Sequence, residues 1–120
     1  MRDRRKYERI HLIHFLRIFN NKTNQFIGNV VDITPEGMKL LSEEKVDEDQ
    51  VFQLRMELPL EVKLDFENGL DGKRALVFKA RSIWCDVDIN PDLFAVGFYL
   101  ENITSENIQM IRKLIYMYEE

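Results

Sequence analysis

Strict alternation of apolar and polar residues is the feature that most constrains the fold of this sequence. Residues 52–58 alternate without a break, and residues 62–66 repeat the pattern. Successive side chains of a β-strand point to opposite faces, so a period of two indicates strands with one buried face. Such half-buried strands are typical of antiparallel sheets. The body of the chain is therefore predicted to consist of antiparallel strands.

Turn residues divide the rest of the chain into further short runs. Turns are expected at the asparagine-, glycine- and proline-containing stretches 20–24, 34–37, 68–72 and 90–92. The order Thr-Pro-Glu-Gly at residues 34–37 fits a type I turn. The apolar runs between turns predict further strands over residues 10–19, 25–33, 38–41, 75–87 and 93–100.

The period changes near the C-terminus. Thr104 is expected to be an N-cap with Glu106 in the first turn, and a helix is predicted over residues 104–118. Its apolar residues recur at helical spacing: Ile108, Ile111, Leu114, Ile115 and Tyr118. The predicted fold class is therefore mainly β, a small six- or seven-stranded antiparallel β-barrel with a C-terminal α-helix.

The charge distribution is uneven along the chain. The sequence has a formal net charge of -4, yet residues 1–9 carry five basic side chains and two acidic ones. An acidic chain is not expected to bind nucleic-acid polymers in general, because such binders normally carry a basic excess. A compact positive segment on an acidic body favours a small anionic partner.

Two short motifs flank the first predicted hairpin. Arg5 and Arg9 form R-x-x-x-R in the basic segment, and Asp32, Thr34 and Gly37 form D-x-T-x-x-G at the end of a strand. An ionised aspartate only accepts hydrogen bonds, which suits the N1–H and N2–H₂ donors of guanine. Arginine can fork onto guanine O6 and N7 or onto phosphate oxygens, and it can stack on a purine.

Strand geometry predicts how the second motif presents its side chains. Asp32 and Thr34 are two residues apart and should share a face, while Val31 and Ile33 should point into the core. Thr34 and the backbone N–H groups of the turn are expected to donate to a phosphate. Gly37 is expected to let the backbone approach a ligand closely.

The order and separation of these motifs resemble the PilZ domain, the bacterial receptor module for cyclic di-GMP. Its signature is R-x-x-x-R followed, one hairpin later, by [DN]-x-[ST]-x-x-G. The similarity continues in later segments of the chain, at residues 82–84, 94–98 and 104–106. The resemblance implies that Arg5 and Arg9 close over the ligand, and that Asp32, Thr34 and Gly37 hold it from below.

The resemblance also carries two departures and one further residue. Thr34 stands where the family more often has serine, and Glu36 stands where many members have a second glycine. An additional arginine directly before R-x-x-x-R, here Arg4, implies two mutually stacked cyclic di-GMP molecules per chain.

The resemblance implies one domain over residues 1–120. A flexible basic ligand-binding arm is expected over 1–9, the barrel over 10–100 and the helix over 104–118. The implied function is a stand-alone, non-enzymatic receptor that orders its arm over cyclic di-GMP and signals to an unidentified protein partner in trans. The alternative is a ligand-independent protein-interaction module on the same fold. A third reading, an OB-like single-strand binder, is disfavoured by the acidic pI of about 5.3.

No cofactor, metal or catalytic group is expected. His11 and His14 are an odd number of positions apart on a predicted strand, so their side chains should face opposite sides. The one cysteine, Cys85, cannot form an internal disulfide. With no recognisable targeting segment and no apolar run long enough to span a membrane, a cytoplasmic protein is predicted. Trp84 is expected in the core or at the barrel rim.

Overall fold

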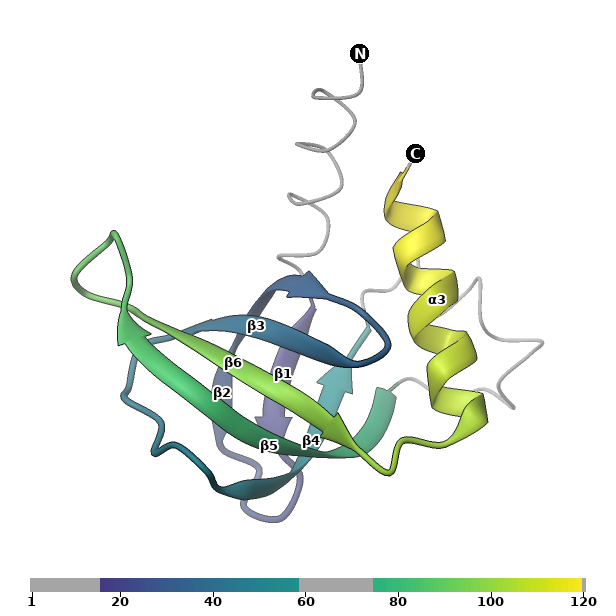
Figure 1. Ribbon diagram of the computed structural model, residues 1–120, viewed down its shortest axis with the longest axis horizontal. Helices are drawn as coiled ribbons and strands as arrows, with labels where there is room; N and C mark the ends of the chain where they lie inside the picture. Colours follow the sequence, from purple (N-terminus) through teal and green to yellow (C-terminus); the bar gives the residue numbers. More distant parts are fainter. Residues whose placement is uncertain (1–15, 59–74, 120) are drawn as a thin grey trace.

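Six antiparallel strands close into a barrel, and a helix follows at the C-terminus (Figure 1). The computed structural model describes residues 16–58 and 75–119. The strands are arranged in the order β1-β2-β3-β6-β5-β4 around the barrel, and β1 pairs with β4 to close it. The bounds are β1 Arg17–Asn20, β2 Phe26–Ile33, β3 Gly37–Ser42, β4 Val51–Glu57, β5 Ala75–Val87, β6 Phe94–Glu101 and α3 Ser105–Glu119. The predicted fold class is confirmed, with six strands in the described part of the chain.

The alternation that predicted the fold is realised in β4. Leu54, Met56 and Leu58 are buried, while the polar residues between them are only partly covered. The ring of Phe52 packs edge-to-face against Phe98 across the barrel interior, with 5.8 Å between ring centroids. The core is thus filled by one face of each strand. The second alternating run, residues 62–66, lies outside the described residues.

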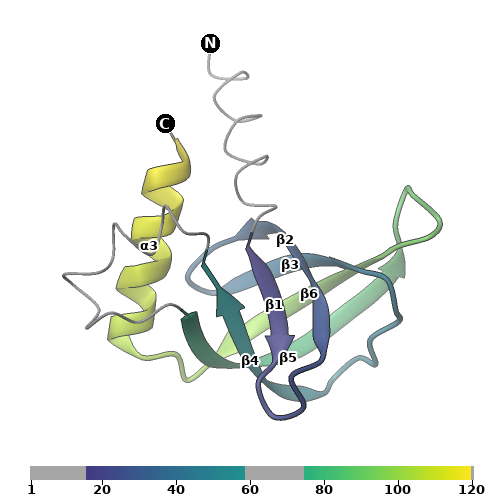
Figure 2. The same cartoon turned by 180° about the vertical axis from the view of Figure 1, so that it is seen from behind.

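The helix begins where the sequence predicts. The hydroxyl Oγ1 of Thr104 accepts a hydrogen bond from the N–H of Asn107 at 3.1 Å, which is the N-cap geometry. Met110, Ile111 and Leu114 are buried and belong to the same cluster as the strand side chains. The side-chain amide of Asn107 also donates to the carbonyl of Val77 in β5 at 2.9 Å. These contacts hold α3 beside the barrel (Figure 2).

A bulge in β2 changes which residues face the core. Val30 pairs with Leu40 and Asp32 pairs with Lys39, so Val31 is an extra residue without a partner of its own on β3. Val30 is fully buried and Val31 is only partly covered. The prediction that Val31 points into the core is therefore wrong, because the bulge interrupts the period of two. Ile33 is buried as predicted.

A second bulge lies in β5. Ser82 pairs with Phe98 and Trp84 pairs with Gly97, so Ile83 is the extra residue. Without it, Trp84 would share a face with Ser82, which is completely buried. The bulge instead turns Trp84 to the outer face of the barrel. The expectation of a core or rim position for Trp84 is corrected accordingly.

Candidate functional site

The predicted site residues divide into two groups. Asp32, Thr34 and Gly37 are described, and all three lie at the β2–β3 hairpin. Arg4, Arg5 and Arg9 belong to the predicted arm over residues 1–9, which lies outside the described residues, as do His11 and His14. The β2–β3 hairpin is therefore the part of the predicted site that the structure describes.

The hairpin turn is closed by Thr34 and Gly37. The N–H of Thr34 donates to the carbonyl of Gly37 at 2.8 Å, and the N–H of Gly37 donates to the carbonyl of Thr34 at 3.3 Å. Proline fixes a negative φ at residue 35, and Glu36 is not among the residues with positive φ, so the turn fits the predicted type I.

The hydroxyl of Thr34 serves this turn. Its Oγ1 accepts hydrogen bonds from the N–H groups of Glu36 and Gly37, each at 3.2 Å. The same N–H groups are predicted from the sequence to face a phosphate, and in the structure they donate to the threonine hydroxyl. The short threonine side chain competes for nearby backbone donors, as is common for this residue type in turns. The carbonyl of Glu36 also accepts from the N–H of Leu100 at 2.9 Å, which attaches the turn to β6.

Gly37 is required by the sheet. A Cβ atom at this position would lie 2.6 Å from the carbonyl oxygen of Phe98 in β6. Because this oxygen belongs to the backbone, it cannot move aside as a flexible side chain would. The glycine therefore permits the close approach of β3 and β6, and this role needs no ligand.

The structure joins Asp32 to three further residues in a row across the outer face of the barrel, which we call the outer row. Asp32 in β2 pairs with Lys39 in β3, Lys39 pairs with Gly97 in β6, and Gly97 pairs with Trp84 in β5. Directly opposed residues of an antiparallel pair share a face, with Cβ atoms about 5 Å apart. Asp32 and Lys39 are exposed and Trp84 is half-buried. The outer row thus presents a carboxylate, an ammonium group and an indole on one surface.

Glycine at position 97 lets the indole lie against the sheet. A Cβ on Gly97 would be 2.2 Å from Nε1 of Trp84 and 2.3 Å from its Cε2. The ring therefore occupies the space that any larger residue at 97 would need. Sequence reasoning did not assign Lys39, Trp84 or Gly97 to the site. Gly97 and Trp84 lie in two different strands that the sequence predicts. Only the pairing register brings the two residues together.

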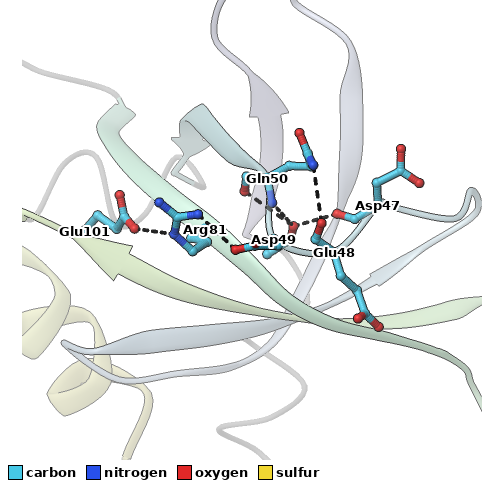
Figure 3. A network of polar contacts seen from close by, with 7 residues as sticks. Asp47, Glu48, Asp49, Gln50, Arg81 and Glu101 are labelled. Atoms are coloured by element: carbon cyan, nitrogen blue, oxygen red, sulfur yellow. Dashed lines mark hydrogen bonds and ion pairs between the residues drawn. The ribbon is translucent and has the colours of Figure 1, made fainter.

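The neighbouring cation, Arg81, is already neutralised. Its Nε donates to Oε2 of Glu101 at 2.6 Å, and its Nη1 donates to Oδ1 of Asp49 at 3.0 Å (Figure 3). The hydrogen bond to Glu101, followed by that to Asp49, raises the pKa of Arg81 above its ordinary value. Both carboxylates would compete with an incoming phosphate, so Lys39 is better placed than Arg81 to meet one.

An apolar groove adjoins the outer row. It has a volume of about 350 Å³ and is lined by residues of β2, β3 and nearby connections: Phe26, Asn29, Val31, Leu41, Glu43 and Leu93. Val31, the bulged residue, directly precedes Asp32. The polar row and the apolar groove are therefore parts of one outer surface.

The described ranges contain neither a cluster suited to a metal ion nor a membrane-spanning helix. No group of three or more His, Cys, Asp or Glu side chains there could hold a metal ion. No helix in residues 16–58 or 75–119 is long and apolar enough to cross a membrane.

Comparison with known proteins identifies the family of the chain. The family model described as "PilZ domain" matches residues 3–117. Comparison with curated proteins finds no match.

Three solved structures share the fold. The PilZ domain with c-di-GMP of YcgR from Escherichia coli aligns with a TM-score of 0.62 at 15% identity, over 89% of this chain and 84% of that one. The inhibitor of motility MotI/DgrA from Bacillus subtilis gives 0.64 at 12% identity, over 85% of this chain and 45% of that one. YcgR in complex with c-di-GMP, also from Escherichia coli, gives 0.62 at 16% identity, over 87% of this chain. The chain spans 40% of that last structure.

Proposed function

The chain belongs to the PilZ domain family, and from this premise we propose that it is a cyclic di-GMP receptor whose ligand binds on the outer row. The observation that carries the proposal is the alignment of Asp32, Lys39, Gly97 and Trp84 across four strands, beginning in the D-x-T-x-x-G motif. It offers an acceptor, a cation and an aromatic ring to one side of a guanine dinucleotide.

Each member of the outer row has a defined role in this proposal. The carboxylate of Asp32 accepts from guanine N1–H and N2–H₂. The ammonium group of Lys39 offsets a phosphate charge, and the indole of Trp84 stacks on a guanine base. The absence of a side chain at Gly97 leaves room for the indole of Trp84 to lie against the sheet at this point of the outer row.

The arginine segment completes the site from the other side of the ligand. We assign Arg5 and Arg9 to the guanine edge or the phosphates, and Arg4 to a second stacked ligand. Residues 1–9 fold over the ligand when it binds, and the covered surface signals to a protein partner in trans. Two of the compared structures are in keeping with such a role, since one is a PilZ domain with c-di-GMP and the other is an inhibitor of motility.

A titration with cyclic di-GMP, followed by calorimetry, tests the proposal directly. Saturable binding is expected, with at most weak binding of GMP and GTP, because neither reproduces the paired guanines. A matched variant with Arg5 and Arg9 both changed to alanine should bind far less. Equal heats for the wild type and this double variant would overturn the proposal.

One observation favours a second candidate function, a ligand-independent interaction module. The donors of the 34–37 turn are already used by Thr34, and Gly37 is needed by the β3–β6 contact. Thr34 and Gly37 therefore have structural roles in the motif that need no ligand. A folded protein that shows no heat with cyclic di-GMP, GMP or GTP would favour this alternative.

A further inference from the structure

Strand β5 extends beyond the end of its pairing with β4. Val51, the first residue of β4, pairs with Arg81, and β5 continues for six further residues alongside β6. The segment 47–50, which precedes β4, takes over as neighbour of β5 (Figure 3). The N–H of Ser82 donates to the carbonyl of Gln50 at 2.9 Å, and the N–H of Asp49 donates to the carbonyl of Ser82 at 2.6 Å. We call residues 47–50 the acidic clamp.

The side chain of Ser82 fixes the clamp from inside. Ser82 is completely buried. Its hydroxyl donates to the carbonyl of Asp47 at 2.6 Å and accepts from the N–H of Gln50 at 3.1 Å. One buried hydroxyl thus binds two backbone groups of the clamp. Outside the barrel, the ion pair of Arg81 with Asp49 adds a third connection.

The clamp contacts β5 in its bulged register. After Ser82, the next N–H of β5 that it binds is that of Cys85, which donates to Oε2 of Glu48 at 3.2 Å. In a regular strand, N–H groups directed to one edge recur every second residue. Here the spacing is three, because Ile83 is the extra residue of the bulge. Glu48 therefore provides an acceptor where only the bulged strand presents a donor.

This bulge decides where Trp84 points. In the bulged register Trp84 lies opposite Gly97 on the outer face, whereas a regular register would direct it inward. We propose that the acidic clamp holds β5 in the bulged register, so that Ser82 and Glu48 are positioning residues for the indole of Trp84. For ligand binding the inference rests on the proposed function; for the orientation of the indole it does not.

Tryptophan fluorescence tests the orientation without any ligand, because Trp84 is the only tryptophan of the chain. The variants are Ser82→Ala, which removes the buried hydroxyl, and Glu48→Ala, which removes the acceptor for Cys85. In both, the indole should leave the surface of Gly97, giving red-shifted emission and stronger quenching by acrylamide. Loss of the contact with Gly97 exposes an indole that is half-buried in the wild type.

The chain offers a rescue and a matched control. Glu48→Gln keeps an amide oxygen at the same place and should restore the wild-type emission. Asp47→Ala removes an acidic side chain from the same clamp, but the contact of Asp47 with Ser82 runs through its backbone carbonyl. It should leave the emission unchanged. Should Ser82→Ala fail to fold, the exposed position 48 still decides the question.

Titration with cyclic di-GMP then separates this inference from the proposed function. Ser82→Ala and Glu48→Ala should weaken binding by about 2- to 10-fold, the effect of one hydrogen bond. Altered emission in a protein whose wild type binds no cyclic di-GMP would reject the proposed function and keep the clamp. Emission identical to that of Asp47→Ala would overturn the clamp. Altered emission with unchanged affinity would overturn the role of Ser82 and Glu48 in ligand binding.

Discussion

The indole of Trp84 occupies the space above Gly97, where an added Cβ would lie 2.2 Å from Nε1. The two residues are directly opposed on β5 and β6. Their fit depends on the bulge at Ile83 and places an aromatic ring on the same outer surface as Asp32.

Gly97→Ala should displace the indole and weaken cyclic di-GMP binding by about 1–3 kcal/mol, the value of one base–aromatic stack. The new methyl group meets a side chain, which can move, so the barrel should still fold. Fluorescence emission should shift to the red, and calorimetry should show the lost affinity. Unchanged emission and affinity would contradict the proposed contact.

Gly37→Ala is the comparison variant. Its Cβ would meet the backbone oxygen of Phe98 at 2.6 Å, and this oxygen is fixed by the sheet. A lower melting temperature is therefore expected for Gly37→Ala than for Gly97→Ala. The opposite order would show that the β3–β6 contact does not require glycine.

Thr34 should matter for stability before it matters for binding. Thr34→Ala removes the acceptor of two backbone N–H groups in the turn and should lower the free energy of unfolding by about 0.5–1.5 kcal/mol. Thr34→Ser keeps the hydroxyl and should stay close to the wild type. Denaturant unfolding measures both. A Thr34→Ala variant as stable as the wild type would show that the turn does not depend on this hydroxyl.

The sequence predicts those features that depend on neighbouring residues along the chain. The burial of Leu54 and Met56 follows from a period of two, and the N-cap at Thr104 follows from local chemistry. Strand pairing is different, because it joins residues far apart in sequence. One extra residue in β2 and one in β5 reverse the faces of the residues after them, and neither leaves a clear mark in the sequence.

The same reason explains why part of the candidate site was missed. Asp32 was identified from its motif, but Lys39 and Trp84 join it only through three successive strand pairings. The need for glycine at position 37 likewise comes from Phe98, far away in the sequence. A motif therefore located one end of the outer row, and the register of the barrel supplied the rest.

Asp32 should determine base selectivity and contribute little to stability. Its side chain is exposed at the end of β2. Asp32→Ala should abolish the discrimination of cyclic di-GMP from its adenine counterpart, because the acceptor opposite two guanine donors is lost. Parallel titrations with both dinucleotides measure this. If Asp32→Ala lowers only the melting temperature, the residue forms the turn and does not select the base.

Arg5 and Arg9 should act on binding alone. Arg5→Ala and Arg9→Ala should each cost about 1.5–3 kcal/mol of binding free energy, the scale of a charge-assisted hydrogen bond. Arg5→Lys should also bind less well, since lysine keeps the charge but loses the planar fork. Calorimetry and thermal unfolding are measured on the same samples. A large loss of thermal stability without a loss of affinity would assign these residues to the fold.

Arg4 should set the number of ligands. A second cyclic di-GMP brings further phosphate charges into the site, and a third guanidinium beside Arg5 and Arg9 would offset their mutual repulsion and could stack on a purine. Two ligands per chain are therefore expected, with one remaining in Arg4→Leu. The carboxylate of Glu36 is exposed in the 34–37 turn. It is expected to oppose the second anion, so Glu36→Gln should tighten the second binding step.

Calorimetric stoichiometry, checked by the mass of the complex in native mass spectrometry, measures this number. Arg2→Leu removes a charge from the same segment outside the motif and serves as the control, which should keep two ligands. Saturation of the wild type at one ligand would reject the role of Arg4. Loss of all binding in Arg4→Leu would instead show that Arg4, like Arg5 and Arg9, binds the first ligand.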